Sequence, residues 1–258
     1  MTARVRRLGA ATLRQLVEIG EAVRFGGRIL AATVQPPSRG RFFMAAVYDS
    51  GVLSVALVCA SAVTVGFVLG LQLYNTLARF GAEDSLGTAV GLSLIRELGP
   101  VLTGLLVTGR AGSAITAEIG AMRSSQQLDG LRMMAIDPVH FIVMPRALAL
   151  AFVMPLLSAI FVVLGIFGAY LMGVELLGLD AGSYFSGLEL AVEFRADVLQ
   201  SLVKSIVFGL LLGLIATFRG YSCEPHSAGV SRATTSTVVT ASICILLADY
   251  LLTALWSV

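Results

Sequence analysis

Four ionisable side chains lie inside stretches that are otherwise apolar: Arg96, Glu97, Lys204 and Asp249. An unpaired charge at the centre of a membrane helix costs about 3 kcal/mol or more, so such residues usually face the interior of a helix bundle and pair. Two cations and two anions can neutralise one another, and Lys204 is the only lysine of the chain. These residues predict an intramembrane charged network with two open interpretations: a polar belt that borders a lipid or ion pathway, or an interhelical clamp.

The composition places these charges in a membrane protein. The 258 residues are 57% hydrophobic and 13% charged, and the mean hydropathy is +0.88, which is not typical of soluble proteins. The uncharged stretches 50–78 and 147–174 exceed the roughly 20 apolar residues that cross a bilayer. The composition argues against a cytosolic enzyme, and the net charge of +2 gives no indication of a nucleic-acid partner.

Five membrane spans are predicted, at about residues 47–76, 86–110, 142–173, 196–218 and 233–256. Residues 1–41 hold eight arginines against two glutamates, whereas the stretch after the third span is mostly acidic. Because positively charged loops stay in the cytoplasm, we expect the N-terminus there and the C-terminus on the periplasmic side. With this arrangement the four charges lie at similar depth, about 10 to 16 Å from the outer ends of their helices.

Residues 1–40 are predicted to form an interfacial amphipathic helix and a hinge, ahead of a five-span domain at 41–258. At about 100° per residue, one arc of this helix collects apolar side chains, and the arginines fall outside it. The arc consists of Val5, Leu8, Leu16, Ile19, Val23 and Leu30. Such a helix is suited to lie in the membrane interface, although a packed soluble helix has the same pattern. The Pro36-Pro37 pair then predicts the hinge.

Small residues recur at helical spacing, as in the pairs Gly66 with Gly70, Gly209 with Gly213, and Gly109 with Ser113. In lipid, such rows let two helices approach closely. We therefore expect a compact bundle and interpret these glycines as packing residues rather than ligand-binding residues.

The segment between the second and third spans is predicted to be a short cytoplasmic helix over residues 124–135. Ser124 and Gln127 match a capping box, which indicates a helix start. An apolar stripe follows, made by Leu128, Leu131 and either Met134 or Ala135. The pattern alone leaves two interpretations open: a loop helix that rests on lipid, or a docking element for a cytoplasmic protein.

Sequence signatures of catalysis are missing. The chain contains no GxxxxGK[ST], HExxH or GxSxG motif, so it supplies no P-loop and no common hydrolase site. Its three cysteines show no CxxC spacing, which indicates neither a zinc cluster nor a disulfide framework. We therefore expect no catalytic residue, no metal and no cofactor in this chain.

Two stretches resemble the signature of MlaE/YrbE-type permeases, the membrane subunits of ABC transporters that work with MCE proteins. The first begins at Arg96-Glu97-Leu98-Gly99-Pro100 and runs through residues 109–120 to Pro145-Arg146. The second joins residues 227–235 to residues 249–255. The resemblance covers the chain from about residue 48 to its end. It implies an interfacial N-terminal helix, five spans and a homodimer.

The resemblance also implies partners. The helix at 124–135 becomes a coupling helix that docks in the cleft of a separate MlaF-like ATPase, where ATP and Mg²⁺ bind. An MlaB-like STAS protein is expected on that ATPase, and an MlaD-like MCE hexamer on the periplasmic side. The residues expected at the ATPase contact are Ser124, Gln126, Gln127, Leu128, Asp129, Leu131, Arg132 and Met134. Gln126 stands where the family pattern usually has glutamate, so any salt bridge formed there in relatives is not expected here.

A lipid cavity is expected between two protomers, beside the outer end of the first span. Its candidate residues are Leu69, Leu73, Leu77 and Phe80, with Leu98 facing them. Acyl chains would lie on this stripe, while Arg96 or Lys204 would meet the phosphate. Ordinary helix packing explains the same stripe equally well.

The expected function is that of a bacterial inner-membrane permease subunit, with ATP hydrolysed by a separate subunit. It would move phospholipid between the inner membrane and a periplasmic MCE protein and so maintain outer-membrane lipid asymmetry. The main alternative is a stand-alone, ion-coupled secondary transporter or channel that uses the intramembrane charges. A membrane scaffold without a transport role is a third possibility.

Overall fold

The computed structural model describes residue 17, residues 20–32 and residues 40–256. Within these residues the chain forms helices and no strand. Five helical segments are long and apolar enough to cross a membrane: Gly40–Phe80, Glu83–Ser124, Val139–Leu176, Phe194–Ser222 and Ser227–Trp256. The prediction of an all-helical protein with five spans is confirmed.

The first two spans are each built from several consecutive helical segments. The first consists of α2 (Gly40–Val47), the π-helical turn η1 (Tyr48–Val52), α3 (Leu53–Leu77) and the 3₁₀ turn η2 (Ala78–Phe80). The second consists of η3 (Glu83–Ser85), α4 (Leu86–Ser93), η4 (Leu94–Leu98), α5 (Gly99–Val107), η5 (Thr108–Gly112) and α6 (Ser113–Ser124). The π-helical turns η1, η4 and η5 interrupt the regular helix, and such turns are frequent at functional sites.

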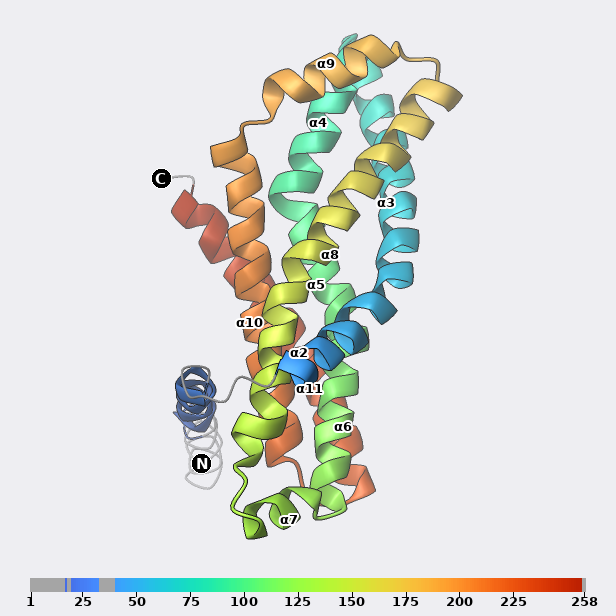
Figure 1. Ribbon diagram of the computed structural model, residues 1–258. Helices are drawn as coiled ribbons and strands as arrows, with labels where there is room; N and C mark the ends of the chain where they lie inside the picture. The colour runs from blue at the N-terminus through green and yellow to red at the C-terminus, as the bar shows by residue number, and fades with distance from the viewer. Residues whose placement is uncertain (1–16, 18–19, 33–39, 257–258) are drawn as a thin grey trace, which may run out of the picture.

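Short helices lie in the connections before and after the third span, at opposite ends of the bundle. The third span consists of η6 (Val139–Val143), α8 (Met144–Tyr170) and η7 (Leu171–Leu176), the fourth of η8 (Phe194–Val198) and α10 (Leu199–Ser222), and the fifth of α11 (Ser227–Trp256). α7 (Gln127–Met133) precedes the third span, and α9 (Ala181–Ala191) follows it. Figure 1 shows these two helices at the two ends of the bundle, hereafter the α7 end and the α9 end.

The second span is longer than predicted, because the helix continues past Arg110 to the end of α6. The sequence prediction ended this span near residue 110, where charged residues follow. In the structure these charges are paired: Arg110 donates a hydrogen bond to the carbonyl of Asp49, and Glu118 accepts hydrogen bonds from Arg146 on α8. Because neighbouring spans supply partners, the charges do not interrupt the helix.

Glycines permit the closest helix crossings. A Cβ added to Gly66 of α3 would lie 2.1 Å from the carbonyl oxygen of Gly165 on α8. A Cβ added to Gly209 of α10 would lie 2.7 Å from the Cα of Ala151, also on α8. α8 therefore packs closely on both α3 and α10 through small residues, as expected in lipid. Gly109, by contrast, has open space around its Cβ position and makes no such crossing with any residue that the structure describes.

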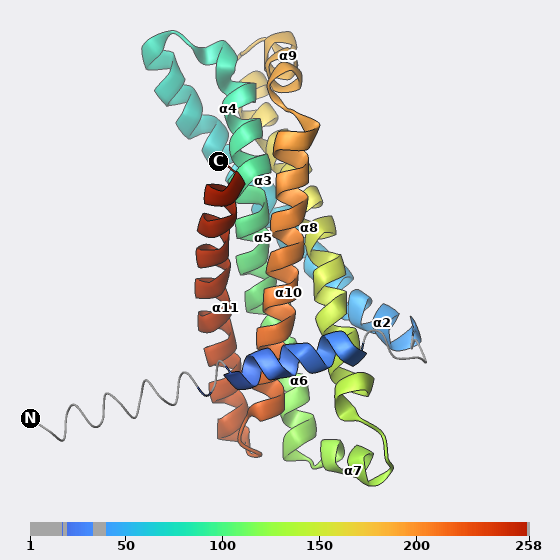
Figure 2. The same ribbon diagram turned by 90° about the vertical axis from the view of Figure 1, so that its left-hand side faces the viewer.

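The N-terminal helix (residues 20–32) lies across the bundle near the α7 end, at a steep angle to the spans (Figure 2). Its buried residues are Phe25, Ile29 and Ala32, which pack against residues of α8, α10 and η6. Val23 and Leu30 of the predicted apolar arc lie on the opposite face and are 67% and 64% exposed. The helix therefore has one apolar face against the bundle and another that points outward.

The structure describes only some residues of the predicted apolar arc. Val5, Leu8, Leu16 and Ile19 of the predicted arc lie outside the described residues, and so does the predicted hinge up to residue 39. The buried face of Phe25, Ile29 and Ala32 was not expected from the sequence. Its partners come from spans more than a hundred residues away, and the local periodicity carries no information about them.

Candidate functional site

Three helices bring the intramembrane charges together. Arg96 and Glu97 lie on the π-helical turn η4, Lys204 lies on α10, and Asp249 lies on α11. Pro100, in the first turn of α5, follows η4 and cannot donate a backbone hydrogen bond. The irregular turn thus places two charged side chains in the middle of an apolar span, where α10 and α11 pass close by.

Lys204 is the centre of this ion cluster, and its side chain is 1% exposed. The ammonium nitrogen donates hydrogen bonds to Glu97 Oε2 at 2.7 Å, to Thr253 Oγ1 at 2.7 Å and to the Arg96 carbonyl at 2.9 Å. Asp249 Oδ1 lies 2.9 Å from the same nitrogen but without hydrogen-bond geometry. Because an ammonium has only three N–H groups, Asp249 is held chiefly by its charge.

The guanidinium of Arg96 pairs with a residue outside the four that were predicted to form the charged network. It forms an ion pair with Asp197 on η8, whose carboxylate is fully buried and also accepts a hydrogen bond from the Glu193 amide at 2.8 Å. Only the backbone carbonyl of Arg96 contacts Lys204. The predicted balanced quartet is therefore a cluster of five charged side chains, and with every group ionised it carries one excess negative charge.

Asp197 and Thr253 are the cluster residues that the sequence interpretation missed. Asp197 belongs to the acidic stretch that follows the third predicted span, yet it precedes Lys204 by two helical turns and so shares its face. Thr253 follows Asp249 by four residues on α11, and its hydroxyl lies 3.1 Å from Glu97 Oε1. Helical spacing from the two predicted residues would have identified both.

The residues predicted to line a lipid cavity differ in exposure. Leu69, Leu73 and Leu77 on α3 and Leu98 on η4 are half-buried and pack against the main hydrophobic core. Phe80, the last residue of the first span, is 80% exposed. Four of the five therefore already have packing partners within one chain, and Phe80 alone projects outward.

The start of α7 corrects the predicted capping box. Ser124 is the last residue of α6, and α7 begins at Gln127 after a turn in which Gln126 has a left-handed backbone with φ of 59°. The residue that caps α7 is Gln126, without a side-chain hydrogen bond, so the capping-box prediction is wrong. The longer second span explains the error, because it incorporates Ser124 into the preceding helix.

The apolar stripe of α7 faces the bundle rather than outward. Leu128 is 2% exposed, and Leu131 is half-buried against the main core. The exposed apolar residues are Met134, at 63%, which the sequence prediction included, and Met133, at 89%, which it did not. The outward surface of α7 therefore combines these methionines with the polar residues Gln127 and Asp129.

Arg132 fixes α7 to the fourth span. It pairs with Asp129 at 2.7 Å and donates a hydrogen bond to the hydroxyl of Tyr221 on α10 at 2.5 Å. Its guanidinium also lies 5.7 Å from the centre of the Tyr221 ring. The bond to Tyr221 and the charge of Asp129 raise the pKa of the Arg132 guanidinium, so it stays charged. α7 is thus attached to α10 as well as to the spans that it connects.

The chain is similar to a known family of permeases. Residues 43–255 match the family described as Permease MlaE. The chain is 43% identical to the intermembrane phospholipid transport system permease protein MlaE of Haemophilus influenzae, over 94% of each chain. It is 39% identical to a probable ABC transporter permease protein of Rickettsia bellii, over 96% of each chain. It is 30% identical to the chloroplastic protein TRIGALACTOSYLDIACYLGLYCEROL 1 of Arabidopsis thaliana, over 80% of this chain and 58% of that one.

Proposed function

The chain belongs to the MlaE permease family, and on this premise we propose that it carries phospholipid between the inner membrane and a periplasmic MCE protein. It is a multi-pass inner-membrane subunit of an ABC transporter, and ATP is hydrolysed by a separate subunit. The observation that carries the proposal is the identity to MlaE of Haemophilus influenzae over nearly the whole of both chains. In this role the chain contributes to outer-membrane lipid asymmetry.

The α7 end is the proposed docking site of the ATPase. α7 lies between the second and third spans and is tied to α10 through Arg132 and Tyr221, so a push on it reaches three spans at once. Its exposed methionines are flexible apolar side chains suited to an adaptable protein contact. The ATPase can change the conformation of the permease only through contacts that differ between the two states of the permease, and in this proposal α7 makes those contacts.

The ion cluster is the proposed headgroup contact in the middle of the transport path. Lys204 is buried and fully engaged, so its role in this proposal is to hold the three helices together. The side chain of Arg96 is 46% exposed although it is paired with Asp197, so it is the better candidate to meet a lipid phosphate. Leu69, Leu73 and Leu77, completed by a second protomer, would line the path of the acyl chains.

The assembly follows from the same premise. We expect a homodimer of this chain, an ATPase with a STAS protein at the α7 end, and an MCE hexamer at the α9 end. Arg24 and Arg28 of the N-terminal helix, with Arg123 and Arg132, lie near the α7 end, and the acidic residues of the third connection lie at the α9 end, so the positive-inside rule supports a cytoplasmic α7 end.

Thiol labelling tests this orientation. A cysteine at the exposed position Met133 of α7 should resist a membrane-impermeant maleimide in spheroplasts and react after permeabilisation. A cysteine at Leu190 of α9, which is 87% exposed, is the matched control and should react in both conditions. The variants are made in a chain without Cys59, Cys223 and Cys244. Labelling of position 133 in intact spheroplasts would reject the cytoplasmic α7 end.

Purification of the native complex tests the function. The tagged chain, extracted in mild detergent, should bring with it an ATPase and an MCE protein, and mass spectrometry should find phospholipid whose amount changes on addition of ATP. Ion flux through the chain alone in proteoliposomes would instead favour the secondary transporter or channel. Partners without any lipid cargo would favour a scaffold.

A further inference from the structure

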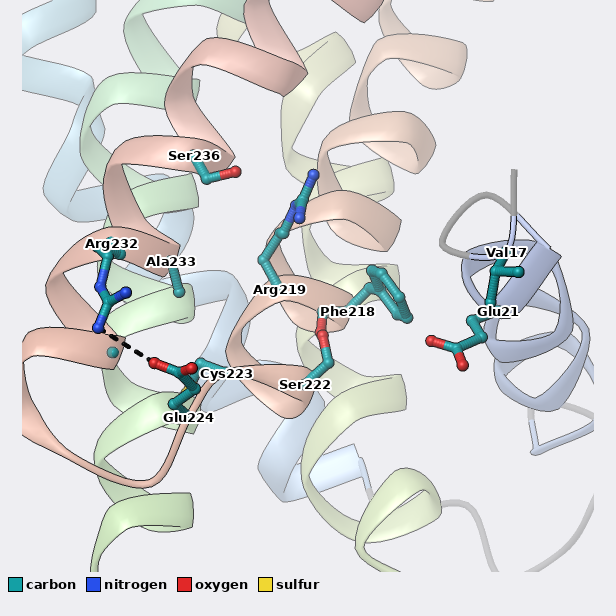
Figure 3. Close-up of a pocket in the computed structure, with 11 residues that line it drawn as sticks. Val17, Glu21, Phe218, Arg219, Ser222, Cys223, Glu224, Arg232, Ala233 and Ser236 are labelled. Atoms are coloured by element: carbon teal, nitrogen blue, oxygen red, sulfur yellow. Dashed lines mark hydrogen bonds and ion pairs between the residues drawn. The ribbon is translucent and has the colours of Figure 1, made fainter. Parts of the chain in front are cut away.

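A second polar site lies at the α7 end, far along the spans from the ion cluster. An open hollow of about 730 Å³ is bordered by the N-terminal helix, the last turns of α10 and the first turns of α11. Its polar lining consists of Glu21, Arg219, Ser222, Glu224, Arg232 and Ser236 (Figure 3). Volumes of this size are typical of small-molecule sites, and the mixture of charged groups with the apolar walls Phe218 and Ala233 suits an amphipathic ligand.

The N-terminal helix places the hollow at the level of lipid headgroups. This helix crosses the spans (Figure 2), and its outward face carries the exposed apolar residues Val23 and Leu30. A helix that lies across a membrane bundle with an apolar face turned outward is positioned at the boundary between headgroups and acyl chains. Val17 and Glu21 of the same segment line the hollow, so the hollow opens at that boundary.

The charges of the hollow come in two signs. Figure 3 shows Arg219 extending from α10 to the level of Ser236 on α11, and Glu21 projecting from the N-terminal helix toward α10. Arg232 lies 3.1 Å from Glu224, and both side chains are more than half exposed. The Ser222 hydroxyl donates to the Phe218 carbonyl at 2.6 Å, so its oxygen is left as an acceptor. The lining thus contains the guanidinium groups of Arg219 and Arg232 together with carboxylate and hydroxyl acceptors. Both arginines already have partners within the chain, and Arg232 pairs with Glu224, so a ligand with a phosphate and an ammonium can engage both signs at once.

We propose that this hollow binds the headgroup of a zwitterionic phospholipid, with the phosphate at Arg219 and Arg232 and the ammonium at Glu21, Glu224 and Ser222. Basic pockets between membrane helices bind lipid phosphates, and guanidinium groups suit phosphate oxygens in particular. Two carboxylates in the same hollow repel a second negative charge and attract an ammonium group. The site depends only on the chain lying in a membrane, so it stands even if lipid transport is disproved.

Photocrosslinking of the full purified chain tests the site. The probe is a phosphatidylethanolamine with a photoreactive group near its glycerol, and adducts are mapped by mass spectrometry. Adducts on residues 218–236 should fall about tenfold or more in the double variant Arg219→Gln and Arg232→Gln, because two charge-assisted hydrogen bonds are lost. Arg24→Gln, an exposed arginine of the N-terminal helix outside the hollow, is the matched control and should leave them unchanged. Unchanged adducts in the double variant would overturn the proposal.

Competition on the unaltered chain identifies the ligand class and does not depend on whether a variant folds. Unlabelled phosphatidylethanolamine should reduce the adducts more strongly than phosphatidylglycerol, and millimolar inorganic phosphate should have little effect. The variant Glu21→Gln with Glu224→Gln should abolish the preference between the two lipids. Equal competition by both lipids in the unaltered chain would reject the ammonium contact, and competition by phosphate as strong as by lipid would reject a headgroup site.

Discussion

The ion cluster around Lys204 and the ion pair on α7 contain the same kinds of groups in opposite surroundings. Lys204 is 1% exposed and bonded to Glu97 and Thr253, whereas Arg132 and Asp129 are 51% and 59% exposed. A buried charge that loses its partner remains desolvated, while an exposed charge is compensated by water. The cluster therefore holds the spans together, and the charges of α7 are available to another protein.

Replacement of Lys204 should have the largest effect. Lys204→Met leaves Glu97 and Asp249 without their cation and should lower the free energy of unfolding by about 3 to 5 kcal/mol. Thermal unfolding of the detergent-purified chain, together with its abundance in membranes, measures this loss. Adding Glu97→Gln and Asp249→Asn to the variant should restore most of the stability. A single variant as stable as the unaltered chain would remove the distinction between the two regions.

A substitution at the close α3–α8 crossing should have the second-largest effect on stability. In Gly66→Ala the new Cβ would lie 2.1 Å from the Gly165 carbonyl oxygen, so α3 and α8 must separate. The expected destabilisation is about 1 to 3 kcal/mol. Gly109→Ala is the matched control, because none of the described residues lies within 4 Å of its Cβ position. Equal unfolding temperatures for the two variants would show that the α3–α8 crossing tolerates side chains.

The buried phenol of Tyr184 at the α9 end should make the stability of the chain depend on pH above 9. Burial raises the pKa of Tyr184 to about 12, and its hydroxyl donates to the Ile166 carbonyl at 3.0 Å. In the unfolded chain this phenol ionises near pH 10, while in the folded chain it stays neutral. The contribution of the neutral phenol to folding stability is therefore complete below pH 10 and is lost as the pH rises through 12. Between pH 9 and pH 11 the unaltered chain should lose about 1 kcal/mol more stability than Tyr184→Phe in thermal unfolding. If the unaltered chain and Tyr184→Phe lose the same stability over this pH range, Tyr184 is not a buried neutral phenol.

The exposed pair on α7 should give the smallest change. Asp129→Asn removes the ion pair with Arg132, and the expected change in unfolding free energy is within about 0.5 kcal/mol. The ATPase rate of the assembled complex is the second measurement, because Asp129 lies on the proposed docking surface. A loss of stability as large as that of Lys204→Met would contradict the assignment of α7 as a solvent-exposed contact element.

The number of spans and the presence of an intramembrane charged network were predictable from the sequence. Runs of roughly 20 apolar residues report a crossing regardless of what surrounds them, because the bilayer itself is the partner. Lys204, Glu97 and Asp249 were predicted to pair for a similar reason, since a charge in such a run needs a counterion wherever the helix lies. The family resemblance rested on contiguous motifs, and the comparisons confirm it.

Only the tertiary structure decided which partner each group takes. Arg96 pairs with Asp197 and not with the predicted cluster members. Leu128 is buried against the bundle, and the N-terminal helix buries Phe25 while Val23 is exposed. These outcomes depend on how each helix is rotated about its axis and on where a π-helical turn shifts that rotation. The rotation of each helix depends on close contacts between distant spans, such as Gly66 with Gly165. The periodicity of one helix cannot predict these contacts.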